Sequence, residues 1–112
     1  MDTITDDFMK QMMMTTKPYT MVILTKGPHF NRPDAPGIIW EHGRRNFSLR
    51  AEGLLSVVFP IRDESDKAGV GVFNASVEET KKIIEEDPAV KEGILSYEVH
   101  MTRSFPGDKL PG

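Results

Sequence analysis

Apolar and β-branched stretches alternate along the chain with two segments whose apolar positions recur every three or four residues. The strand-like stretches cover residues 19–25, 54–61, 68–74 and 94–101, and Gly, Pro or charged turn residues bound them. In the first stretch, apolar side chains occupy both alternating sets of positions, which is typical of a strand buried on both faces. The pattern therefore predicts four strands.

The first predicted helix covers residues 34–51, where Asp34 can cap the first turn and Gly53 stops the last. One face of this helix consists of Ile39, His42, Asn46 and Leu49. The preceding segment, residues 27–37, contains three prolines and is predicted to be a long loop. A histidine and an asparagine therefore interrupt an otherwise apolar face.

The second predicted helix opens with the capping box Ser76-Val77-Glu78-Glu79. It ends at Asp87-Pro88, because a residue that precedes proline avoids the helical region. The resulting order of elements is β-α-β-β-α-β. This order predicts an α+β, ferredoxin-like fold with a four-stranded antiparallel sheet.

Right-handed crossovers place both helices on one face of this sheet. The strands are apolar on both faces, so the face without helices should not meet water. We expect a second copy of the chain to cover it and to form a homodimer. The alternative is that the N-terminal arm covers this face.

The same topology brings the start of the first helix, the end of the second strand and the end of the second helix to one edge. His42, Pro60 and Asp87 should therefore lie close together, whereas His100 belongs to the opposite edge. A carboxylate bonded to one imidazole nitrogen fixes the tautomer and makes the other nitrogen a general base or acid. The alternative is a buried histidine and a helix-ending aspartate without a catalytic role.

Together these residues resemble the YciI-like (YCII-related) proteins over roughly residues 19–101. The matching features are His42 and Leu49, then Gly53, Pro60, Gly71-Val72-Phe73, the Ser76 helix start and the run from Asp87-Pro88 to Gly93-Ile94. The most specific element is Asp-Pro-x-x-x-x-Gly with the upstream histidine. The resemblance implies a dimeric α+β barrel with a His42–Asp87 active site.

One branch of that family dehydrochlorinates chlorinated hydroxyquinones. This chain departs from the family pattern by Phe59-Pro60 where Gly-Pro is usual, by Asn46 where an apolar residue is usual, and by its long proline-rich loop. These departures predict a substrate different from that of the dehydrochlorinase.

Further candidates for substrate binding lie in the elements predicted at this edge. They are Arg44, Arg45, Asn46, His29, Ser96, Pro60, Trp40 and Phe30. The arginines could hold an anion and the aromatic residues could line an apolar pocket. Solvated surface positions explain the charged residues and His29 equally well.

Composition narrows the class of protein. The 112 residues support one domain over residues 19–102, with a flexible arm at 1–18 and a tail at 103–112. The arm's methionine cluster could bind copper through thioethers, but a frayed segment, translated from an upstream start codon, is the favoured interpretation. The net charge of −3 and the lack of stacking aromatics argue against a nucleic-acid partner.

The chain contains no cysteine, no apolar run that could span a bilayer and no signal-peptide pattern, so we expect a cytoplasmic protein without a membrane partner. Dinucleotide, serine-hydrolase and metal-site motifs are absent, so no cofactor or metal is expected. The leading hypothesis is a small-molecule enzyme that catalyses elimination, isomerisation or hydrolysis of a small metabolite, neutral or anionic. The alternatives are a non-catalytic ligand-binding or structural dimer and a cofactor-independent oxygenase.

Overall fold

The computed structural model describes residues 3–112. Its elements, in chain order, are α1 (Asp6–Met13), β1 (Lys17–Lys26), α2 (Ala35–Ala51), β2 (Leu55–Pro60), β3 (Lys67–Phe73), α3 (Val77–Glu85), α4 (Pro88–Lys91) and β4 (Leu95–Ser104). The strands form one sheet in the order β2-β3-β1-β4, and every neighbouring pair is antiparallel. The predicted ferredoxin-like α+β fold is confirmed.

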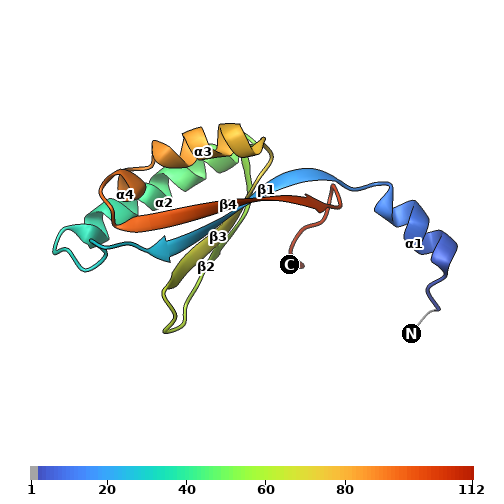
Figure 1. Cartoon of the computed structure of the whole chain (residues 1–112), viewed down its shortest axis with the longest axis horizontal. Coiled ribbons are helices and arrows are strands. Elements are labelled where there is room, and N and C mark those ends of the chain that lie inside the picture. The colour runs from blue at the N-terminus through green and yellow to red at the C-terminus, as the bar shows by residue number, and fades with distance from the viewer. Residues whose placement is uncertain (1–2) are drawn as a thin grey trace.

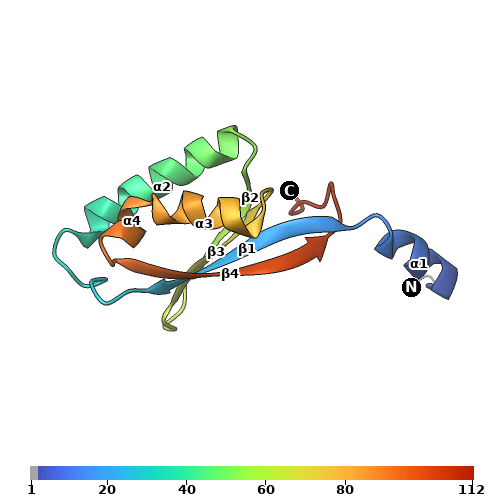
Figure 2. The ribbon, with the colours of Figure 1, turned by 45° about the horizontal axis from the view of Figure 1, so that its top comes forward.

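Helices α2, α3 and α4 cover one face of the sheet and leave the other face open (Figures 1 and 2). The main core lies between these layers and consists of Val22, Leu49, Leu55, Phe73 and Ile84. A second buried cluster of Ala35, Ala89, Ile94 and Leu95 ties the start of α2 to α4 and β4. This second cluster fixes α4 beside α2, which is the arrangement that the candidate site requires.

Two strand boundaries differ from those expected by more than one residue, and one helix was not expected. Strand β1 begins at Lys17 and β4 runs to Ser104, because these two residues pair at the end of a long two-stranded ladder. The short helix α4 was not predicted. It follows directly from Asp87-Pro88, since the aspartate caps a new helical turn and the proline occupies the first position of that turn.

The N-terminal segment forms helix α1, whose first turn is capped by the Thr5 hydroxyl, which accepts a bond from the Phe8 amide. None of the α1 residues is buried, and the helix stands away from the body of the molecule (Figures 1 and 2). The described residues of the arm therefore do not cover the open sheet face. Met1 and Asp2 lie outside the described residues, and the flexibility of this arm stays a prediction.

Between residues 3 and 112, the helices lack the combination of length and apolar character that crossing a membrane requires.

Candidate active site

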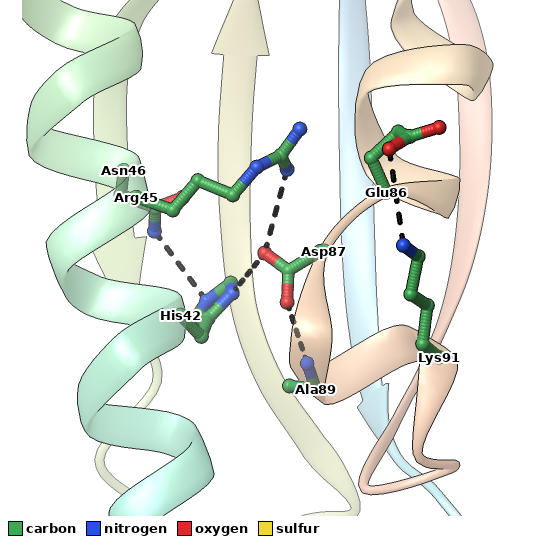
Figure 3. A network of polar contacts seen from close by, with 7 residues as sticks. All are labelled: His42, Arg45, Asn46, Glu86, Asp87, Ala89 and Lys91. Atoms are coloured by element: carbon green, nitrogen blue, oxygen red, sulfur yellow. Dashed lines mark hydrogen bonds and ion pairs between the residues drawn. The ribbon is translucent and has the colours of Figure 1, made fainter.

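His42 and Asp87 are in direct contact at the junction of α2 and α4 (Figure 3). The distance from His42 Nδ1 to Asp87 Oδ2 is 2.6 Å. The exposed fractions of the two side chains are 13% and 2%, so the carboxylate is enclosed while the imidazole keeps one accessible edge. The convergence expected from the topology is present.

The backbone of α4 holds the Asp87 carboxylate in place. Asp87 is the N-cap of α4, and its Oδ1 accepts a hydrogen bond of 2.8 Å from the Ala89 amide (Figure 3). Its second oxygen is left for His42. The residue that ends α3 in the sequence pattern therefore also starts α4 and orients the imidazole.

The surroundings of Asp87 favour its charged form. Burial alone raises the pKa of the Asp87 carboxyl, but the hydrogen bond and charge of His42 act against it, together with the Ala89 amide and Arg45. The pKa of Asp87 consequently lies below its usual value. Arg45 Nη1 is 3.8 Å from Asp87 Oδ2. The site holds an ionised carboxylate behind the imidazole.

The contacts of the imidazole favour one tautomer. An ionised carboxylate only accepts hydrogen bonds, so Nδ1 of His42 must carry the proton that faces Asp87. On the other side, the Asn46 amide nitrogen lies 3.4 Å from Nε2 (Figure 3). In this orientation of its carboxamide, Asn46 donates to Nε2, which fits the tautomer that the Asp87 contact fixes. Both neighbours leave Nε2 with the lone pair that a general base needs.

A cavity of about 630 Å³ lies between α2 and the neighbouring strands β2 and β3. Both His42 and Asn46 line it, and most of the remaining wall is apolar. Gly69 and Gly71 form part of its floor on the helix-facing side of β3, where they contribute no side chains. Cavities of this size and character bind small molecules in many proteins.

The other predicted site residues divide into those that line this cavity and those that do not. Pro60 and Phe30 line it. Arg45 contacts Asp87 from outside the cavity, and Arg44 pairs with Glu41 on the exposed side of α2.

Three further predicted residues lie away from the cavity. His29 bonds through Nδ1 to the Glu92 carbonyl at 3.0 Å, and the Trp40 side chain is 70% exposed. Ser96 belongs to the open sheet face, because its neighbours Leu95 and Tyr97 pack toward the helices.

Several cavity residues were missed by the sequence analysis. Arg50 follows His42 and Asn46 at intervals of four residues on α2, a spacing that could have identified it. Lys26 is the last residue of β1 and Arg62 follows the end of β2, and the topology places these two strand ends at one edge. Phe47 is also part of the wall and carried no recognisable signal.

Among residues 3–112, no three His, Asp or Glu side chains gather as a metal site would require.

No family model matches the chain, and no curated protein matches it either. Among solved structures it is similar to 5-chloro-2-hydroxyhydroquinone dehydrochlorinase (TftG) from Burkholderia phenoliruptrix, determined in complex with 2,5-dihydroxybenzoquinone. The TM-score is 0.51 at 16% sequence identity, and the match covers 73% of this chain and 90% of that one. At this identity the likeness shows a shared fold.

Proposed function

We propose that this chain is a small-molecule enzyme that uses His42 as its general base or acid, with Asp87 as the positioning residue. The observation that carries the proposal is the 2.6 Å contact between His42 and the buried Asp87, beside a cavity that the imidazole lines. The reaction classes that fit are elimination, isomerisation and hydrolysis of a small metabolite.

In elimination and isomerisation, Nε2 of His42 removes a proton from a C–H or O–H group of the substrate, and in hydrolysis it removes one from the attacking water. The imidazolium that results faces the ionised Asp87, which stabilises the positive charge. The proton then returns to the product or to the leaving group. Residues in this role accelerate reactions by about 10²- to 10⁴-fold. The chemistry requires no redox cofactor.

Two further observations support the proposal. The dehydrochlorinase with a similar fold acts, by its name, on a small chlorinated hydroxyquinol. The sequence also resembles the YciI-like proteins around His42 and Asp87. Membership of that family is therefore part of the proposal. A cytoplasmic location is proposed as well, since a chain without cysteine fits a reducing compartment.

The proposal includes a homodimer formed through the open sheet face. Met21 and Ile23 of β1 alternate with the buried Val22 and therefore point away from the helices, as do Val70 and Val72 of β3. These side chains are only half-buried in the single chain. A second copy packed on this face would remove a contiguous apolar surface from water.

Proton abstraction can be tested before the substrate is known. We would incubate the full chain in D₂O with a panel of hydroxyquinols, ketones and keto acids and follow C–H to C–D exchange by NMR. The wild type should accelerate exchange of at least one compound. His42→Gln and Asp87→Asn should reduce that acceleration at least about 100-fold, whereas the surface variant Arg44→Gln should keep it.

Circular dichroism of each variant separates loss of chemistry from loss of folding. Exchange that is unchanged in folded His42→Gln would contradict the catalytic proposal. It would leave the pair as a link between α2 and α4. Oxygen consumption with a hydroxyquinol would instead favour the oxygenase alternative.

A further inference from the structure

The charged residues that line the cavity are all of one sign. Lys26, Arg50 and Arg62 belong to its wall, together with His42. No Asp or Glu within residues 3–112 lines the cavity, although the chain as a whole carries a net charge of −3. A concave apolar site edged by cations concentrates the potential that attracts anions.

The arginines of this cavity also differ from the others in their contacts. The arginines outside the cavity have partners in the chain: Arg32 with Asp34, Arg44 with Glu41, Arg45 with Asp87 and Arg103 with Thr16. Within residues 3–112, Arg50 and Arg62 make no ion pair and no side-chain hydrogen bond. Their guanidinium groups are therefore available to a ligand.

Lys26 is less available than the arginines. Its Nζ donates a hydrogen bond of 2.9 Å to the Ser65 carbonyl and lies 5.5 Å from the centre of the Phe30 ring. Lys26 adds positive potential at one end of the cavity, but it offers a ligand fewer hydrogen-bond donors than a guanidinium group does.

Helix α2 arranges the polar groups of the cavity in a row. His42, Asn46 and Arg50 follow one another at intervals of four residues, and all three line the cavity. At a rise of 1.5 Å per residue, the backbone of Arg50 lies about 12 Å along the helix from that of His42. A ligand bound beneath this face can therefore reach the imidazole at one point and a guanidinium at another.

We infer that the cavity binds small organic acids with a flat apolar body, whose anionic group is held by Arg50 while the rest of the molecule reaches His42. The inference rests on the proposed function, since it names the substrate class of the same site. Guanidinium groups bind carboxylates through paired hydrogen bonds. The apolar walls, including Phe30 and Phe47, suit an aromatic ring.

Binding of a matched pair of probes tests this inference. The probes are 2-naphthoate and its neutral analogue 2-naphthamide, titrated into the ¹⁵N-labelled full chain near pH 7. Naphthoate should shift the amide signals of Gly69, Gly71 and the His42 turn. It should bind at least about tenfold more tightly than naphthamide, as charge-assisted hydrogen bonds predict.

Substitutions identify the groups that hold the anion. Arg50 and Arg62 are exposed, so Arg50→Gln and Arg62→Gln should fold normally. Arg50→Gln should weaken naphthoate binding by roughly tenfold and leave naphthamide binding unchanged, whereas Arg62→Gln, at the opposite end of the cavity, should have a smaller effect. The matched control Arg44→Gln, which lies outside the cavity, should bind naphthoate as the wild type does.

Three outcomes would overturn the inference. They are equal binding of the two probes, unchanged naphthoate binding in Arg50→Gln, and no binding of naphthoate at millimolar concentration. Asp87→Asn separates this inference from the proposed function, because it should still bind naphthoate but lose proton exchange. Selective naphthoate binding without any His42-dependent exchange would leave the anion site standing and remove the enzyme proposal.

Discussion

The side chain of Asp87 has two roles. One oxygen caps α4 through the Ala89 amide, and the other holds His42. The carboxylate is almost completely enclosed, so its orientation is set by these two contacts and not by solvent. Because the aspartate is anchored to the backbone, the imidazole that it holds is also fixed in rotation and in tautomer.

The lowered pKa of Asp87 makes a prediction for stability in acid. A carboxyl whose pKa is lower in the folded state stabilises the fold above its ordinary pKa, and this stabilisation is lost as pH falls through the folded value. Near pH 7 we expect the free energy of unfolding of Asp87→Asn to be about 1 kcal/mol lower than that of the wild type. Asparagine still caps α4, which limits the loss.

Melting temperatures measured from neutral pH down to below the usual aspartate range test this. The difference between wild type and Asp87→Asn should shrink as pH falls through that range. Asp34 and Asp63, whose pKa values are also lowered, are present in both proteins and drop out of the difference. A difference that stays constant into strong acid would show that the charge of Asp87 does not stabilise the fold.

At the scale of elements, β3 determines where the cavity lies. Its helix-facing positions are Gly69, Gly71 and Phe73, so only the last fills the space below the helices. The two glycines leave a floor without side chains opposite His42 and Asn46. The depth of the cavity therefore depends on Gly69 and Gly71, although β3 contributes no proposed catalytic side chain.

The two glycines should respond differently to alanine. A Cβ at Gly71 would come 3.3 Å from the end of the flexible Leu55 side chain, whereas one at Gly69 would come 3.1 Å from the Phe59 backbone oxygen. Gly71→Ala should therefore keep its melting temperature and bind naphthoate more weakly. Gly69→Ala should lose roughly 1–3 kcal/mol of unfolding free energy. Wild-type naphthoate affinity in Gly71→Ala would show that the ligand does not contact the floor of the cavity.

The elements themselves were predictable to different degrees. Apolar periodicity and turn residues located the four strands and the helices α2 and α3, because those patterns reflect burial on one or both faces. Helix α4 was missed because Asp87-Pro88 ends one helix and starts the next, and the same residue types signal both.

The candidate site was predictable only where topology decides it. The His42–Asp87 contact follows from which ends of the elements share an edge of the sheet. The rotation of α2 about its own axis is a matter of packing, so the sequence pattern could not show that Trp40 is exposed, whereas the four-residue spacing from His42 and Asn46 could have identified Arg50. For the same reason, the sequence left Arg44 and Arg45 open between anion binding and solvated surface.

At the scale of the whole molecule, the open sheet face is the feature that a single chain leaves unexplained. Helices cover one face, and α1 stands away from the other (Figures 1 and 2). The half-buried apolar positions on this face are continuous across β1 and β3. The proposed face-to-face homodimer would remove this surface from water.

Sedimentation equilibrium tests the dimer. The wild type at micromolar concentration should have twice the mass of the chain. Ile23→Glu and Val72→Glu, which place charges in the centre of the open face, should shift it to the monomer. The control Leu110→Glu, in the exposed C-terminal tail, should remain dimeric. A wild type that is monomeric at these concentrations would contradict the proposed interface.

The measurement that tests the central claim most directly is ¹⁵N NMR of the His42 imidazole, recorded at a pH where the ring is neutral, in the wild type and in Asp87→Asn. The wild type should show the Nδ1–H tautomer, with an unprotonated Nε2 available to the cavity. Asp87→Asn should show a mixture of tautomers, because asparagine can donate to Nδ1 as well as accept from it. A wild-type ring protonated at Nε2 would mean that His42 offers no base to the cavity, and the acid–base account of this site would be wrong.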